Sequence, residues 1–264
     1  MILQAFDIKK YYGEFCALDG VSLCIDAGEF VSIIGPNGAG KSTLVNVLTG
    51  LQRPSTGRVS FKERDITGMG PARLARLGMA RSFQLVNIFP ELTVLEVLQV
   101  AVISRLRQGT RLFTSLARHR QVTAQALEVA ELFALADKGG MLARQLPQGD
   151  KKLLDVASAF ALHPEVILLD EPTSGVSTQD KHAIMVILVA AAKRIGIRAI
   201  LQVEHDMDIV FGYSDRIVAL YQGRVLVDST PEQVRANEEV VRLVLGHRSR
   251  GATRNHLSLD TQAG

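Results

Sequence analysis

The hydrophobic positions of this chain form short apolar runs that alternate with longer stretches of helical spacing. Short, mostly apolar runs are typical of strands buried on both faces of a sheet. The predicted strands lie at 30–34, 166–170, 198–203, 216–220 and 224–228, and the predicted helices lie at 151–162, 179–195 and 206–213. Because helices join these strands, the pattern predicts an α/β fold with a mainly parallel sheet that helices cover on both faces.

The N-terminal part of the chain is rich in β-type segments. We predict strands in five places before the long helices: 2–8, 15–18, 21–25, 56–61 and 78–84. Asp19-Gly20 is a dipeptide typical of tight turns, so we expect it to separate the second strand from the third.

The pattern changes to helical spacing over residues 91–145. Thr93 is placed to cap a helix whose apolar positions are Leu95, Leu98, Ala101 and Val102. A second amphipathic stretch runs from about 116 to 135. We therefore expect a helical subdomain, over about 86–150, inserted in the α/β core. Residues 247–264 are polar and aperiodic, and we expect them to form a disordered tail.

Composition narrows the choice of partners and compartment. Apolar residues make up 47% of the 264, enough for a substantial core, and a net charge of +3 argues against a dedicated nucleic-acid binder. The two cysteines, Cys16 and Cys24, are expected to be free thiols in a reducing compartment. No signal peptide is evident, and the uncharged stretch at 183–192 is too short to span a bilayer. Any membrane association is therefore expected to go through a partner.

Residues 35–43, Gly-Pro-Asn-Gly-Ala-Gly-Lys-Ser-Thr, fit the phosphate-loop pattern G-x-x-x-x-G-K-[ST]. Glycines let the backbone curl so that several N–H groups point at one anion. A helix that starts at about Lys41 places the positive end of its dipole beneath the phosphates. In this pattern Lys41 meets the β- and γ-phosphates of a nucleotide and Ser42 offers its hydroxyl to Mg²⁺. The residues that we expect to hold the nucleotide are Gly35, Asn37, Gly38, Gly40, Lys41, Ser42 and Thr43.

Two acidic residues follow the apolar run at 166–169. Open α/β sheets bind ligands at the carboxyl ends of their strands. At that edge Asp170 is expected to hold Mg²⁺, and Glu171 is expected to polarise the water that attacks the γ-phosphate. Alone, the pair would be interpreted as two solvated carboxylates. Together with the upstream phosphate loop, it favours a catalytic role.

A histidine and an aromatic residue complete the candidate site. His205 follows the strand at 198–203, where an imidazole can contact the γ-phosphate and fix the attacking water; an ordinary loop histidine is the alternative. Tyr12 is a candidate for stacking on an adenine ring. Tyr11 is its rival, and a core or surface role is the alternative for both. The other histidines show no metal-ligand spacing and are expected at the surface: His119, His163, His182, His247 and His256.

The order of these motifs resembles that of the ATP-binding subunits of ABC transporters. The aromatic–glycine pair Tyr12-Gly13 precedes the phosphate loop. The later segments follow in the order of that family: Ser82-Phe83-Gln84, Leu146–Asp150, Glu171-Pro172-Thr173, Val203–Asp206 and Ser214–Ile217. The resemblance covers roughly residues 1–246, and the segments at 204–207 and 223–234 look most like the branched-chain amino-acid importer group. It implies a P-loop NTPase fold of the ABC ATPase type, with an N-terminal antiparallel β subdomain and an inserted α-helical subdomain.

The resemblance also implies roles for residues that the pattern alone leaves open. Gln84 would join the magnesium and water site and sense the membrane subunits, although a plain polar strand end is the alternative. Gly149 would contact the ATP held by an opposing subunit. The helical subdomain would dock the coupling helices of integral-membrane permease subunits. Several basic side chains would either face that interface or form a solvated surface: Arg105, Arg107, Arg111, Arg118 and Arg120.

The segment at 146–150 departs from the family signature Leu-Ser-Gly-Gly-Gln, which acts on the nucleotide of the opposing subunit. Pro147 replaces the serine and has neither a hydroxyl nor an N–H, so a charge-assisted hydrogen bond of roughly 1.5–3 kcal/mol is missing. Gln148 replaces a glycine. Asp150 adds a negative charge, and it is also a candidate cap for a helix that begins at Lys151. Ser177 stands where the family usually carries an aspartate.

The resemblance implies a subunit that hydrolyses ATP with Mg²⁺ and energises an importer of branched-chain amino acids or related small organic solutes. It would lie peripherally on the cytoplasmic face of the inner or plasma membrane. Its expected partners are permease subunits, a second ATP-binding subunit and, indirectly, a periplasmic solute-binding protein, with no nucleic acid. The altered signature favours a heterodimer, with a homodimer as the alternative. Two other functions stay open: a regulatory module that uses ATP to dimerise with weak or no hydrolysis, and an ABC ATPase acting on nucleic acid or ribosomes.

Overall fold

A computed structural model describes residues 1–82, 89–106 and 120–246. Within these residues the larger sheet has six strands in the order β10-β9-β3-β8-β7-β6. Their bounds are β3 Phe30–Ile34, β6 Met79–Arg81, β7 Val166–Asp170, β8 Ala199–Val203, β9 Arg216–Tyr221 and β10 Arg224–Ser229. All neighbours pair in parallel except β10, which runs antiparallel to β9. The predicted mainly parallel sheet is confirmed.

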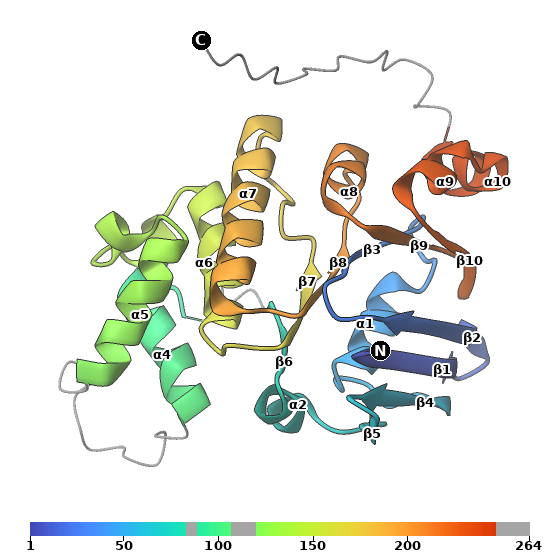
Figure 1. Cartoon of the computed structure of the whole chain (residues 1–264), viewed down its shortest axis with the longest axis horizontal. Helices are drawn as coiled ribbons and strands as arrows, with labels where there is room; N and C mark the ends of the chain where they lie inside the picture. Colours follow the sequence, from blue (N-terminus) through green and yellow to red (C-terminus); the bar gives the residue numbers. More distant parts are fainter. Residues whose placement is uncertain (83–88, 107–119, 247–264) are drawn as a thin grey trace, which may run out of the picture.

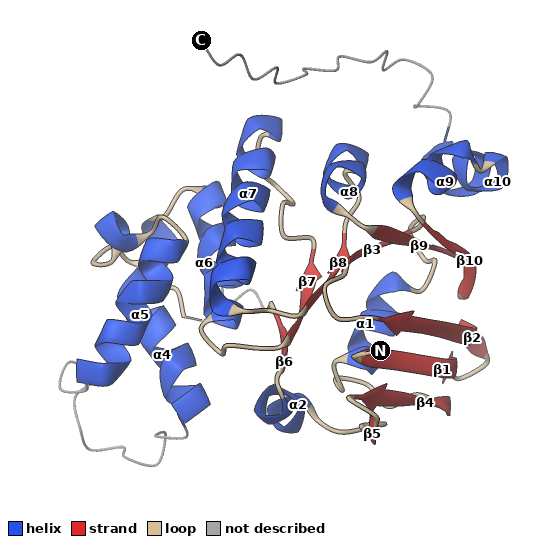
Figure 2. Ribbon diagram, in the orientation of Figure 1, coloured by secondary structure: helices blue, strands red, loops and turns tan. Residues whose placement is uncertain are grey.

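Helices cover both faces of this sheet, as the apolar runs predicted. They are α1 Lys41–Leu48, α6 Gln148–Phe160, α7 Thr178–Ile195 and α8 Met207–Tyr213. Figures 1 and 2 show α1 between the two sheets, with α6, α7 and α8 on the opposite side of the larger one. The residues of β7 alternate accordingly: Val166 and Leu168 pack with α1, and Ile167 and Leu169 pack with α6 and α7.

The smaller sheet is antiparallel and four-stranded within the described residues, in the order β2-β1-β4-β5. Its strands are β1 Leu3–Tyr12, β2 Phe15–Ile25, β4 Thr56–Phe61 and β5 Arg64–Asp65. The predicted turn at Asp19-Gly20 is wrong, because β2 runs through it. Leu18 pairs with Lys10 and Val21 pairs with Ile8, so Asp19 and Gly20 together face one residue of β1 and form a bulge. Gly20 has φ +76°, a conformation suited to glycine.

The helical part of the chain contains α4 Val94–Leu106 and α5 Arg120–Leu132 and packs on α6. Thr93 caps α4 as predicted: its Oγ1 accepts from the Glu96 N–H at 3.2 Å, and the Glu96 carboxylate accepts from the Thr93 N–H at 2.8 Å. The rings of Phe133 and Phe160 lie edge to face at 5.0 Å and join this part to α6.

Several short helices were not predicted from hydrophobic spacing. They are α2 Pro71–Leu77, α9 Pro231–Ala236, α10 Glu238–Val240 and a π-helical turn at Val241–Leu245. Two of them begin with proline, which suits the first position of a helix, so the proline rather than the apolar period was the available signal. Across the described ranges, none of the helices has both the length and the apolar character needed to cross a bilayer.

Candidate nucleotide site

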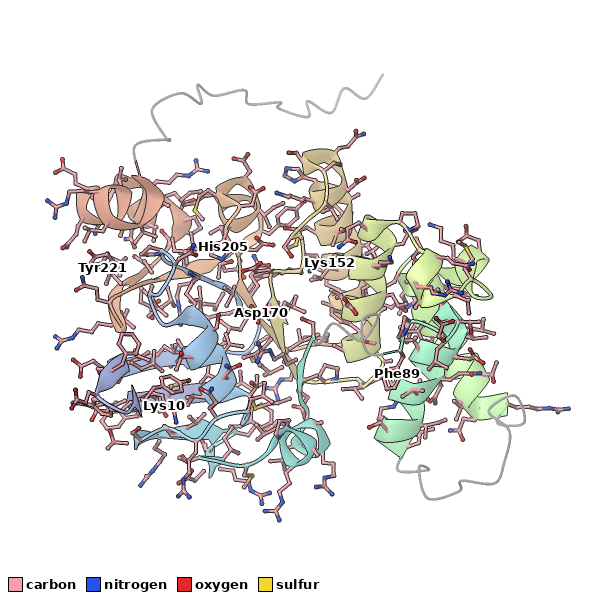
Figure 3. All side chains as sticks on the ribbon, turned by 180° about the vertical axis from the view of Figure 1, so that it is seen from behind. Lys10, Phe89, Lys152, Asp170, His205 and Tyr221 are labelled. Atoms are coloured by element: carbon pink, nitrogen blue, oxygen red, sulfur yellow. The ribbon has the colours of Figure 1, made fainter. Side chains whose placement is uncertain are left out.

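The predicted phosphate-loop, Asp170–Glu171 and His205 residues meet at the carboxyl edge of the larger sheet. The phosphate loop follows β3, Asp170 ends β7, and His205 lies just beyond β8. Figure 3 shows Lys152 and His205 on either side of Asp170. A cavity of about 450 Å³ lies at this edge, and its lining includes Ser42, Asp170 and Glu171. A ligand at this edge would touch three elements that are far apart in the sequence.

The phosphate loop has a conformation that only glycine allows at two positions. At Gly40, which has φ +101° and precedes α1, an added Cβ would lie 2.7 Å from the carbonyl oxygen of Ala17. At Gly35 it would lie 2.4 Å from the carbonyl oxygen of Leu220. The helix begins at Lys41, as predicted, so its free N–H groups face the loop. The backbone is therefore arranged to bind an anion.

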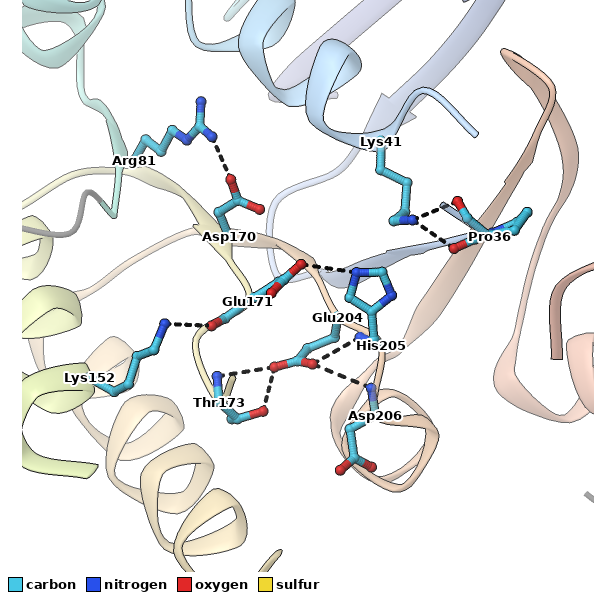
Figure 4. Close-up of polar contacts among 11 residues, drawn as sticks. Pro36, Lys41, Arg81, Lys152, Asp170, Glu171, Thr173, Glu204, His205 and Asp206 are labelled. Carbon is cyan, nitrogen blue, oxygen red and sulfur yellow. Dashed lines mark hydrogen bonds and ion pairs between the residues drawn. The ribbon is translucent and has the colours of Figure 1, made fainter. Parts of the chain in front are cut away.

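Lys41 is buried within this loop. Its Nζ donates to the carbonyl oxygens of Gly35 at 2.7 Å and Pro36 at 3.0 Å, as Figure 4 shows. Burial lowers the pKa of the Lys41 ammonium, and the carboxylates of Glu171 and Asp170 act in the opposite direction. Phosphate oxygens can take the place of the two carbonyls, because an anion is a stronger acceptor for an ammonium group.

Ser42 and Asp170 line the same cavity and offer oxygen donors. Oxygen is the donor that Mg²⁺ prefers, and Mg²⁺ usually binds through one or two protein ligands together with substrate phosphates. In the ranges that the structure describes, no three His, Cys, Asp or Glu side chains are grouped to hold a metal ion. Ser42 and Asp170 therefore fit a metal ion that binds together with a nucleotide better than one held by protein ligands alone.

Glu171 and His205 are in direct contact. His205 Nε2 lies 3.0 Å from Glu171 Oε1. The side chain of His205 is 46% exposed and that of Glu171 is 42% exposed. Glu171 has φ +49°, an uncommon conformation for a residue other than glycine. Its carbonyl oxygen accepts from Lys152 Nζ at 3.3 Å, and its N–H donates to Val203 at 2.9 Å. The backbone thus holds the carboxylate and the imidazole beside the cavity, where they can bind one water molecule.

A buried carboxylate that was not singled out from the sequence connects these two residues. Glu204 is only 3% exposed. It accepts from both the N–H (3.1 Å) and the hydroxyl of Thr173, from the His205 N–H (2.9 Å) and from the Asp206 N–H (3.4 Å). Figure 4 shows these bonds joining the segment after Glu171 to the loop that carries His205. An acidic residue directly after a fully buried strand was the available signal.

The segment at 146–150 differs from the prediction in one respect. The helix α6 begins at Gln148 rather than Lys151, and Pro147 is its N-cap residue without a side-chain hydrogen bond. Asp150 is therefore no cap; it lies in the first turn and pairs with Lys138 at 2.8 Å. Gly149 lies in the same turn, and an added Cβ would come no closer than 4.0 Å to Val176. Gly149 is not part of the described lining of the cavity, and its role toward another chain stays a prediction.

The remaining candidate residues have varied outcomes. Tyr11 and Tyr12 are both partly exposed, and the Tyr12 hydroxyl donates to Gln52, so the choice between them stays a prediction. His163 and His182 are exposed, as expected. Several residues lie outside the described ranges: Gln84, Arg107, Arg111, Arg118, His119, His247 and His256. Cys16 and Cys24 are free thiols.

Comparisons with known proteins agree with this geometry. The family described as "ABC transporter" matches residues 18–174. The high-affinity branched-chain amino acid transport ATP-binding protein LivG of Salmonella typhimurium is 38% identical over 252 residues, which cover 93% of this chain and 98% of LivG. The ADP conformation of an ATP-binding cassette of an ABC transporter is 33% identical with a TM-score of 0.81, covering 92% of this chain and 97% of that one. A dimeric cassette with ADP and Pi bound, in a post-hydrolysis state, is 26% identical with a TM-score of 0.73, covering 87% and 99%.

Proposed function

The chain belongs to the ABC transporter family, and from this membership we propose that it is the ATP-hydrolysing subunit of an importer of branched-chain amino acids or related small organic solutes. Its fold is that of an ABC ATPase cassette. The observation that carries the proposal is the Glu171–His205 contact at 3.0 Å, made beside a phosphate loop with Lys41 at its centre. A module that only binds nucleotide has no need of this pair.

The chain's own residues divide the work of hydrolysis. The loop amides and Lys41 bind the terminal phosphates, since both are hydrogen-bond donors and the Lys41 ammonium is buried within the loop. Glu171 accepts a proton from the attacking water, and His205 holds that water in line with the γ-phosphate. Ser42 and Asp170 would hold Mg²⁺, which when bound neutralises phosphate charge. Gln84 is expected at the same site.

A second subunit is expected to complete the site. The related cassette that is dimeric with ADP and Pi supports the association of two subunits, and we propose that they associate head to tail. Because Pro147 offers neither hydroxyl nor N–H to an opposing ATP, a partner with an intact signature segment would serve this chain's nucleotide better than a second copy. We therefore favour a heterodimer on the cytoplasmic face of the membrane, joined to permease subunits that receive solute from a periplasmic binding protein.

This chain offers a docking site for the permease that lies away from the nucleotide site. A hollow of about 540 Å³ lies between α2 and the C-terminal end of α4, with Arg76 and Arg105 in its lining. Among the described residues of this lining, the one carboxylate is that of Glu165, which pairs with Lys62 and with Arg198 (3.3 Å). The remaining charge is positive, so the hollow fits an acidic cytoplasmic segment of a membrane subunit.

Replacing Glu171 with Gln tests the proposed function. The purified chain, alone and with its partner subunit, should lose at least about 100-fold in ATP turnover while still binding ATP, because the amide cannot accept the proton. Glu131→Gln, on the exposed face of α5, is the matched control and should keep full turnover. A regulatory module that uses ATP only to dimerise would show equal behaviour for both variants, and that outcome would reject the ATPase assignment.

A further inference from the structure

Arg81, the last residue of β6, joins two elements of the nucleotide site. Its Nη1 donates to Asn46 Oδ1 at 2.6 Å, and its Nη2 donates to Asp170 Oδ2 at 2.5 Å. The Arg81 side chain is 11% exposed and lines the cavity, and Figure 4 shows it reaching the carboxylate. A planar guanidinium with two such bonds fixes the distance between its partners as well as their charge.

The two partners belong to the elements that carry the expected magnesium ligands. Asn46 lies one helical turn after Ser42, so the two side chains share a face of α1. Asp170 ends β7. Arg81 therefore ties the helix that bears the hydroxyl ligand to the strand that bears the carboxylate ligand, and it uses only one of the two carboxylate oxygens.

The neighbouring residue holds the same aspartate by its backbone. Ser82 Oγ accepts from the Asp170 N–H at 3.3 Å. The end of β6 thus contacts Asp170 at its main chain and at its side chain. A ligand held at two points keeps its orientation when a metal arrives, and outer partners of this kind affect metal affinity by roughly 10–100-fold.

We propose that Arg81 is a positioning residue for Mg²⁺, which sets the spacing of Asp170 and Ser42 through its bond to Asn46. The inference rests on the proposed function, since it assumes that the metal arrives with ATP. Repulsion of the metal by the guanidinium is the opposing effect. Among the described residues that line the cavity, three are acidic and two are cationic, so acidic groups that attract the metal outnumber the cationic ones in this lining: Asp155, Asp170, Glu171, Arg81 and Lys152.

The test is the Mg²⁺ dependence of ATP binding to the full chain, measured calorimetrically in a Glu171→Gln background that prevents turnover. Arg81→Met keeps an unbranched apolar stem and removes the hydrogen-bond donors. It should raise the Mg²⁺ concentration for half-maximal ATP binding by about tenfold or more, with ATP binding in EDTA changed less than about twofold. Arg81→Lys keeps the charge and should show a smaller rise. Arg224→Met removes an exposed pair with Asp19 and serves as the control.

The outcomes separate this inference from the proposed function. An unchanged Mg²⁺ requirement in Arg81→Met would overturn the positioning role, and a lower requirement would show that the guanidinium opposes the metal. If Arg81→Met does not fold, Asn46→Ala decides, because it removes the contact with α1 and leaves the Asp170 pair. Failure of the Glu171→Gln chain to bind ATP at any Mg²⁺ concentration would reject the proposed function itself.

Discussion

The site for the chain's own nucleotide and the segment at 146–150 differ in how their polar groups are partnered. Around the cavity, Asp170 bonds to Arg81 and Glu171 bonds to His205. The Glu204 carboxylate accepts from the backbone N–H groups of Thr173 and His205. In the signature segment Pro147 occupies an N-cap position that usually holds a hydrogen-bonding side chain. This difference supports our proposal that the groups acting on the chain's own ATP are complete, whereas its contribution to another subunit's ATP is reduced.

The segment at 146–150 nevertheless has stabilising contacts within its own chain. Asp150 was expected to add a negative charge near phosphates, and the structure places the ammonium group of Lys138 2.8 Å from this carboxylate. The proline also starts α6 three residues earlier than predicted, because its fixed φ suits a residue at the entrance to a helix. Pro147 therefore leaves the chain's own helix formed, and the effect that we propose for it concerns a neighbouring subunit's nucleotide.

The largest effect is expected from removing Lys41, which tests whether the chain's own phosphate loop binds ATP. Lys41→Ala deletes an ammonium group whose charge-assisted bonds to phosphate contribute about 1.5–3 kcal/mol each, so ATP affinity should fall by roughly 100-fold or more. Calorimetric titration with ATP measures the change. Lys193→Ala, on the exposed side of α7, is the control and should bind normally. Unchanged affinity in Lys41→Ala would refute the entire interpretation of the phosphate loop.

Placing a hydroxyl at position 147 tests whether the segment at 146–150 contributes less to an opposing subunit's ATP. Pro147→Ser should raise the ATPase rate of a homodimer by about tenfold, because it returns one charge-assisted bond to the opposing nucleotide. The same hydroxyl would cap α6 and add about 1 kcal/mol to the free energy of unfolding. Pro71→Ser, at the start of α2, is the matched control for the rate. Full activity of the unchanged homodimer, abolished by changing Gly149, would instead show that the present segment already suffices.

The sequence predicted those parts of the molecule whose structure depends on near neighbours. The apolar run at 30–34, the glycine-rich loop and a helix starting at Lys41 are local features, and the structure confirms all three. Val166–Asp170 was predicted with its exact bounds, because a buried parallel strand is a continuous apolar run.

Features that depend on distant residues could not be predicted. Asp19-Gly20 is a turn signal by itself, yet the pairing of β2 with β1 makes it a bulge. The Arg81–Asp170 bond joins residues 89 positions apart, and the Glu204–Thr173 bonds span 31. No periodicity or spacing rule connects such pairs, so the residues that support the site became visible only once the sheet had placed them side by side.

The smallest effect is expected from the pair that compensates Asp150. Lys138→Ala leaves the Asp150 carboxylate, which directly follows Gly149, without its cation. Partly exposed pairs contribute up to about 1 kcal/mol, so homodimer turnover should fall by no more than about fivefold. Asp150→Asn removes the charge that needs compensation, and in that background Lys138→Ala should have no effect on turnover. Steady-state ATPase rates of the two single variants and the double variant measure this coupling. An equal loss from Lys138→Ala in both backgrounds would show that Lys138 does not act through Asp150.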